Sequence, residues 1–146
     1  MFYHHKETGS VLVITLIFLA VVALLTFSAS VNSQLQQRMS HQFQLKMMAD
    51  QAADAGVVAF YEWISSNPEY WESAHWPTGE WVDFAKQSYF HIPEAALIWQ
   101  TNQVTLNVEG AIINQAGALS ETHLRVRFYR SLDSGNIHLD HWMELY

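Results

Sequence analysis

The sequence predicts an α+β fold in which one long N-terminal helix packs on a small antiparallel β-sheet. The first pattern behind this prediction is an apolar run over residues 11–31, within a stretch that has no charged side chain between Glu7 and Arg38. The second is a change in apolar periodicity, from about every fourth residue in the first half of the chain to every second residue from Gln103 onward. Charged residues form only 14% of the 146 residues, well below the roughly 25% of a typical soluble domain.

The apolar run has the length of a membrane span. With a rise of about 1.5 Å per residue, a helix over residues 11–31 matches a hydrocarbon core about 30 Å thick. A secretory signal would have a shorter apolar region and a clearer cleavage site, and the run is too long for the core of so small a protein. We therefore expect residues 10–33 to form a transmembrane or assembly helix, in which threonine hydroxyls bond backbone carbonyls one turn earlier. Residues 34–146 are expected to be translocated, with Lys6 on the other side of the span.

The helix is expected to continue as an amphipathic segment over residues 34–66. Apolar side chains follow the span at helical spacing, between Gln, Ser, Arg and Lys. This stripe comprises Val31, Leu35, Met39, Phe43, Met47, Ala52, Ala53, Val57, Phe60, Tyr61 and Ile64. Gly56 is either a weak point or a point of close packing, and Pro68 should end the helix at or before Asn67.

An aromatic connecting region is expected over residues 67–100, followed by a β-sheet of three or four strands over residues 101–146. Within the connecting region, residues 80–88 are expected to form a short helix. Alternation of apolar and polar residues identifies the strands. The expected sheet elements are strands at residues 103–109, 122–128 and 137–145, a hairpin turn at 132–136, and either a strand or a loop at 111–119.

The first part of the chain carries the motifs of a known family. A short polar leader over residues 1–9 ends in Gly9, and the apolar run follows directly. Two further motifs come in order: Leu-Gln-Gln-Arg-Met-Ser at residues 35–40 and Asp-Gln-Ala-Ala-Asp-Ala-Gly at residues 50–56. Over about residues 5–60 the chain resembles the PilX-type minor pilins, which carry similar Leu-Gln-Glu-Arg-Met and Gln-Ala-Ala-Glu-Ala stretches. These belong to the superfamily of type IV pilins and type II secretion pseudopilins.

The resemblance implies a pilin-like fold and a defined processing site. A prepilin peptidase would cleave between Gly9 and Ser10 and methylate the new N-terminus at Ser10. Ile14 stands where major pilins carry a glutamate that is thought to pair with a neighbour's terminal ammonium, so the resemblance points to a minor subunit. The residues expected to pack against other helices in an assembled fibre are Val11, Leu12, Ile14, Leu16, Ile17, Phe18 and Leu19.

The function implied by the resemblance is the priming or capping of a type IV pilus filament. The chain would span the inner membrane once, with its C-terminal domain in the periplasm, and later enter a pilus or pseudopilus. Its partners would be other minor pilins, the major pilin, the prepilin peptidase, the inner-membrane assembly platform and membrane lipid. Two alternatives stay open: a minor pseudopilin of a type II secretion system, and a single-pass membrane protein whose periplasmic module binds a ligand or partner.

No motif predicts an enzyme, a cofactor or a metal site. The chain has no cysteine, which excludes a thiolate metal site and a cysteine nucleophile. In the metal-like sequence around His138, Asp140 and His141, strand alternation places His141 on the opposite face from the other two. The net charge of −7 argues against nucleic acid as a partner, and Arg125 and Arg127 are expected on a solvated strand face.

Two apolar sets allow either a core or a partner-binding interpretation. The aromatic rings after Pro68 can cover the sheet, or they can form a partner surface, because Trp and Tyr are enriched at binding hot spots. The candidate partner surface consists of Trp71, Trp76 and Trp81. For the stripe residues Leu35, Met39 and Phe43, intramolecular core is the default expectation, with part of the stripe meeting other helices in a fibre.

Overall fold

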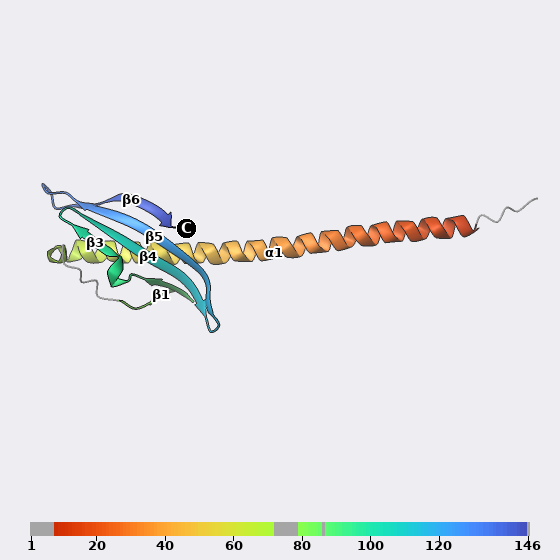
Figure 1. Cartoon of the computed structure of the whole chain (residues 1–146), viewed down its shortest axis with the longest axis horizontal. Coiled ribbons are helices and arrows are strands. Elements are labelled where there is room, and N and C mark those ends of the chain that lie inside the picture. Colours follow the sequence, from red (N-terminus) through yellow and green to blue (C-terminus); the bar gives the residue numbers. More distant parts are fainter. Residues whose placement is uncertain (1–7, 72–78, 86, 146) are drawn as a thin grey trace, which may run out of the picture. The chain divides into compact units, whose positions relative to one another are not determined.

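The computed structural model describes residues 8–71, 79–85 and 87–145. These residues form one helix, α1 (Thr8–Ser66), two short 3-10 helices, η1 (Pro68–Tyr70) and η2 (Glu94–Ala96), and six strands (Figure 1). The chain divides into two compact units, the first ending at His41 and the second beginning at Gln42. The first unit contains the N-terminal part of α1, and the second contains the remainder of α1 and the whole sheet.

The six strands form one antiparallel sheet with the order β1-β2-β4-β5-β6, and β3 pairs with β4 beside this path. The strands are β1 (Val82–Ala85), β2 (Ser88–His91), β3 (Leu97–Gln100), β4 (Gln103–Asn114), β5 (Gly117–Arg130) and β6 (Ile137–Leu145). The α+β class predicted from the sequence is therefore confirmed. β4 and β5 form the long central hairpin, whose turn uses Gly117 at a φ of 122°, a conformation that residues with a Cβ rarely adopt.

The sheet is larger than the sequence patterns predicted. Three short strands, β1 to β3, lie in the region over residues 67–100 where a connection was expected. The short helix expected over residues 80–88 is wrong, because β1 and β2 pair as a hairpin with Val82 opposite Phe90. The strands predicted from alternation are confirmed as parts of β4, β5 and β6, and the ambiguous segment 111–119 is shared between β4 and β5.

α1 ends at Ser66, as Pro68 predicts. Asn67 closes the last turn, because its backbone N–H donates to the Trp63 carbonyl at 3.0 Å and its side-chain Nδ2 donates to the same oxygen at 2.7 Å. The helix runs through Gly56 without a break, so the close-packing interpretation of this glycine is confirmed. A Cβ there would lie 2.7 Å from Cγ1 of Val108 and 2.9 Å from Cδ2 of Phe90.

The hydrophobic core lies between the C-terminal part of α1 and one face of the sheet, seen in Figure 1 where the yellow part of the helix runs along the strands. Small residues bring the helix close to β4: a Cβ on Gly110 would lie 2.2 Å from the Ala49 carbonyl oxygen and 2.5 Å from the Ala53 nitrogen. Further along α1, the fully buried Phe60 ring packs at a centroid distance of 5.9 Å from Phe128 and 6.3 Å from Trp99. The position of the helix on the sheet is therefore fixed by two kinds of packing. Small residues allow close approach near Gly110, and large side chains such as Phe60 fill the space further along α1.

Candidate functional site

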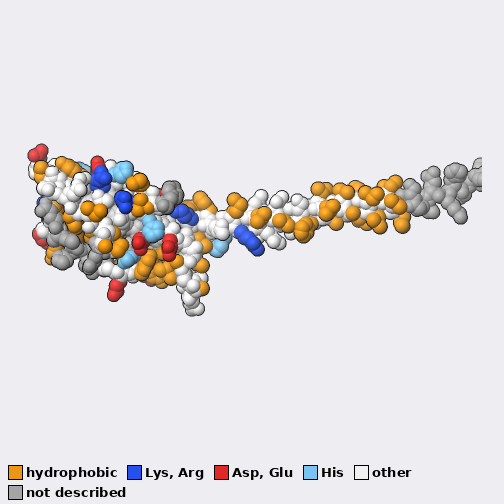
Figure 2. Space-filling view, in the orientation of Figure 1, with side chains coloured by type: hydrophobic (Ala, Val, Ile, Leu, Met, Phe, Trp, Pro, Cys, Tyr) orange, Lys and Arg blue, Asp and Glu red, His pale blue; other side chains and the backbone are white. Residues whose placement is uncertain are grey.

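The N-terminal part of α1 is exposed and apolar on every side. An 18-residue window of this helix has a mean hydropathy of 2.9, and none of it is buried, which makes it a candidate membrane span by length and composition. Figure 2 shows hydrophobic side chains covering this part of the helix, and the first blue side chains appear only further along it. Two of its threonine hydroxyls bond the backbone as predicted: Thr15 Oγ1 donates to the Leu12 carbonyl at 2.9 Å and Thr26 Oγ1 to the Val22 carbonyl at 2.8 Å.

The predicted cleavage and assembly residues fall at the start of this helix. Gly9 and Ser10 lie in the first turn of α1, and the leader residues 1–7 lie outside the described residues. The other predicted assembly residues are all exposed, and Ile14, at the position of the missing glutamate, is 63% exposed. No residue that the structure describes in the first unit covers this surface, so its apolar side chains are available to lipid or to other helices.

The amphipathic stripe separates into two parts. The stripe residues up to Met47, including Leu35, Met39 and Phe43, are exposed, so the expectation that these three form intramolecular core is wrong. The later members face the sheet and are buried, apart from the exposed Tyr61. The buried residues of the stripe are Ala52, Ala53, Val57, Phe60 and Ile64. The change occurs where α1 meets the sheet, because only there does the fold supply an apolar partner.

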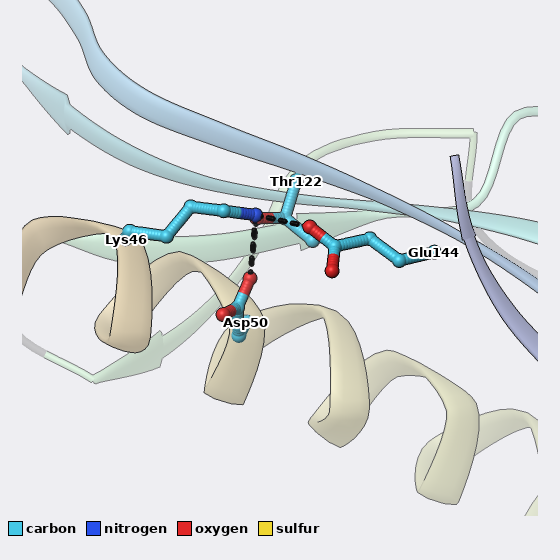
Figure 3. Close-up of polar contacts among 4 residues, drawn as sticks. All are labelled: Lys46, Asp50, Thr122 and Glu144. Atoms are coloured by element: carbon cyan, nitrogen blue, oxygen red, sulfur yellow. Dashed lines mark hydrogen bonds and ion pairs between the residues drawn. The ribbon is translucent and has the colours of Figure 1, made fainter. Parts of the chain in front are cut away.

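A polar cluster holds α1 to the far end of the chain (Figure 3). The Lys46 ammonium, on α1, donates to Asp50 Oδ1 at 3.2 Å, to the Thr122 hydroxyl on β5 at 3.0 Å, and to the Glu144 carboxylate on β6. The Thr122 hydroxyl in turn donates to Asp50 Oδ1 at 2.6 Å. Three elements are thereby joined by charge-assisted hydrogen bonds, which are stronger than neutral ones.

The cluster changes the protonation equilibrium of its lysine. Partial burial alone would lower the pKa of Lys46, but the hydrogen bonds that it donates to Glu144 and Asp50, together with their negative charges, raise this pKa above the ordinary value of 10.5. The ammonium form is therefore the one that the folded protein stabilises. Sequence patterns could not reveal this cluster, because Lys46 is 76 residues from Thr122 and 98 residues from Glu144.

The tryptophans predicted as a partner surface differ in their surroundings. Trp71 is buried: its Nε1 donates to the Thr101 carbonyl at 3.1 Å, and its ring meets Trp99 edge-on at 5.5 Å, so for this residue the core interpretation holds. Trp81 is exposed and packs against His91 with ring centroids 5.1 Å apart. Trp76 lies outside the described residues.

The other face of the sheet is polar. Glu109 lies between two imidazoles, with its oxygens 3.2 Å from His91 Nδ1 and 3.8 Å from His123 Nδ1. Arg125 Nε donates to Asn107 Oδ1 at 2.9 Å, and Arg127 lies 3.7 Å from Asp140, so both arginines have partners within the sheet. This agrees with the solvated strand face predicted for them.

The arrangement of the histidines on β6 differs from the prediction. A bulge in β6 interrupts its alternation, and His138 lies opposite Tyr129 while His141 lies opposite Arg127. Tyr129 and Arg127 are two residues apart on β5 and share a face, so the prediction that His138 and His141 face opposite sides is wrong. Among the described residues, no group of three His, Asp or Glu side chains is arranged to hold a metal ion.

The chain was compared with known proteins in three ways. No family model matches the sequence, and neither a curated protein nor a solved structure matches it.

Proposed function

We propose that this chain is a PilX-like minor pilin that takes part in the assembly of a type IV pilus. The proposal is supported by one observation above all: a single helix, α1, carries both a fully exposed apolar segment and a segment packed on an antiparallel sheet. Such a helix can anchor the subunit in a bilayer and can also hold a folded domain outside it. The leader motif ending in Gly9 adds the chemistry by which such a subunit is processed.

In this proposal the exposed apolar surface is used in two apolar environments in turn. Before assembly it lies in the inner membrane, where helical hydrogen bonding satisfies the backbone. After cleavage between Gly9 and Ser10, and methylation of Ser10, the same surface packs against the helices of other pilins. Because side chains such as Leu16 and Phe18 remain surrounded by apolar groups, the transfer does not expose them to water.

The residue at position 14 specifies the role within a filament. Isoleucine places no charge in the bilayer and offers no carboxylate to a neighbour's terminal ammonium. A subunit without this pair is suited to a low-copy position that primes or caps the filament. The domain in the second unit then makes the contacts with other minor pilins, the major pilin and the assembly platform.

A minor pseudopilin of a type II secretion system would use the same leader and helix, and it is the nearest alternative. The more distant alternative is a single-pass membrane protein whose periplasmic module binds a ligand or partner. It would keep its leader and stay in the membrane.

Leader processing tests the proposal. The full-length chain is co-expressed with a prepilin peptidase, and its intact mass is measured after extraction from the membrane. We expect the loss of residues 1–9, poor cleavage of Gly9→Ala and no cleavage of Gly9→Leu. If the wild-type chain keeps its leader beside a known prepilin that is cleaved in the same cells, the proposal is wrong.

A further inference from the structure

The solvent-facing side of α1 in the second unit carries a shallow depression, here called the acidic groove. It has a volume of about 520 Å³ and is lined by residues of α1 together with Phe84 on β1 and Phe90 on β2. The lining residues on α1 are Gln51, Asp54, Ala55, Val58, Ala59 and Glu62. Its floor is apolar and open: Val58 is 54% exposed and Phe84 is 50% exposed. All of its residues belong to the unit that begins at Gln42.

Two carboxylates on this groove pair with no cation among the residues that the structure describes. Neither Asp54 nor Glu62 forms an ion pair or hydrogen bond with the described residues, whereas Asp50, one turn before Asp54, is bound by Lys46 and Thr122. The two free carboxylates are eight residues apart, which on a helix is about 12 Å. Along α1, one carboxylate therefore lies before the apolar floor and the other after it.

The environment of Asp54 makes a cationic partner favourable. Desolvation by neighbouring atoms, followed by the like charge of Asp50, raises the pKa of Asp54 above its ordinary value. The ionised carboxylate of Asp54 is therefore less stable in the folded protein than in water, and a neighbouring cation would stabilise it. The apolar floor would also favour binding, because covering the exposed Val58 and Phe84 removes apolar surface from water.

We propose that the acidic groove docks an amphipathic α-helix of a partner chain, which presents apolar side chains flanked by two basic residues about two turns apart. The groove follows α1 over two turns, and the small side chains of Ala55 and Ala59 let a second helix approach closely. That the partner is a neighbouring pilin-type helix rests on the proposed function. That a basic amphipathic helix fits the groove follows from the charge and shape of the groove.

A second copy of this chain is the competing occupant, since its Arg38 and Lys46 are also eight residues apart. The Lys46 ammonium, however, is already bound by Asp50, Thr122 and Glu144. A second copy could thus offer only one free cation of the pair, and a different partner chain fits the groove better.

The test uses the full-length chain in detergent micelles and a fluorescent probe peptide, an Ala/Leu-rich helix with two lysines eight residues apart. Binding is measured by fluorescence anisotropy for wild type, for the double variant D54K/E62K and for the control variant E69K/D133K. The control makes the same change in net charge at exposed sites outside the groove. We expect saturable binding to wild type, a loss of about tenfold or more in D54K/E62K, and little change in the control. A matching peptide with two glutamates should prefer D54K/E62K.

Each other outcome contradicts the assignment. Equal losses in the two double variants would mean nonspecific attraction to an acidic protein, and the absence of saturable binding to wild type would remove the groove as a docking site. Self-association of the wild-type chain that D54K/E62K abolishes would assign the groove to a second copy instead. Circular dichroism confirms that both double variants are folded. Leader cleavage is measured separately, so binding without cleavage would overturn only the proposed function, and cleavage without binding only the groove.

Discussion

The two parts of α1 share one continuous backbone but differ in what surrounds them. In the N-terminal part, apolar side chains cover the whole circumference and every one of residues 11–41 is exposed. In the C-terminal part, one face from Ala49 to Ile64 is buried against the sheet, while the exposed side combines acidic side chains with a few apolar ones such as Val58. The N-terminal part therefore leaves apolar surface uncovered, whereas the C-terminal part covers one face with its own domain.

The difference shows that one kind of secondary structure can depend on two sources of stability. The C-terminal part is stabilised by tertiary packing within its own domain. The N-terminal part has no such packing within the first unit, and it requires lipid or other helices. Substitutions in the C-terminal part should therefore change the stability of the domain, and substitutions in the N-terminal part should change membrane or filament association.

The largest effect is expected at the closest contact between α1 and the sheet. Gly110→Ala would place a Cβ 2.2 Å from the Ala49 carbonyl oxygen. This oxygen belongs to the backbone of α1, so the clash can be relieved only if the helix moves away from β4. We expect a loss of about 4 kcal/mol or more in the free energy of unfolding of the domain, measured by thermal melts followed by near-UV circular dichroism. Gly79→Ala is the control, because nothing lies within 4 Å of its added Cβ. Similar melting of both variants would contradict the packing described.

Two phenylalanines on the same helix should separate its two parts. Phe60→Ala empties a fully buried site between Phe128 and Trp99 and should cost about 3–5 kcal/mol in unfolding free energy. Phe18→Ala should change the domain's stability by less than about 0.5 kcal/mol, because the Phe18 side chain is exposed. Instead it should weaken recovery of the chain in filaments. Equal destabilisation of the domain by both variants would mean that the two parts are not distinct.

Lys46→Met should destabilise the domain by about 1 kcal/mol at neutral pH, a modest value because more than a third of the side chain is exposed. Folding raises the pKa of Lys46, so its contribution is complete below pH 10.5 and is lost as the pH rises through the higher folded-state value. The difference between wild type and Lys46→Met, measured by urea unfolding at several pH values, should therefore shrink in strongly alkaline solution. A gap that widens there would show that the cluster does not favour the ammonium form.

The smallest effect is expected from Asp54→Asn, which should slightly stabilise the isolated protein at neutral pH. The pKa of Asp54 is raised in the folded state, so its ionised form disfavours folding above that value, and protonation removes the penalty as the pH falls. Wild type and Asp54→Asn should converge in acid, again by urea unfolding. Destabilisation at neutral pH would mean that the carboxylate has a partner, against the free groove described above.

Local patterns in the sequence predicted the elements that have clear periodicity or punctuation. Pro68 fixed the end of α1, and alternation located the cores of β4, β5 and β6. β1, β2 and β3 were not recognised as strands because each has only four residues, too few for a period of two to stand out. The bulge that reorients His141 likewise leaves no local signal.

The candidate sites divide in the same way. The exposed apolar helix follows directly from composition and length. The Lys46 cluster and the acidic groove do not, because each joins residues from elements that are distant in the chain, such as Lys46 with Glu144 and Val58 with Phe84. The stripe residues Leu35, Met39 and Phe43 show a limit of periodicity: it identifies an apolar face, but it cannot say whether the partner lies in the same chain.

Mass spectrometry of sheared filaments, from cells that express this chain with a pilus assembly system, tests whether the apolar part of α1 leaves the membrane for a filament. We expect a low-abundance chain whose N-terminal peptide begins at N-methylated Ser10 and lacks residues 1–9. A chain found only in the membrane fraction, still beginning at Met1, would contradict it.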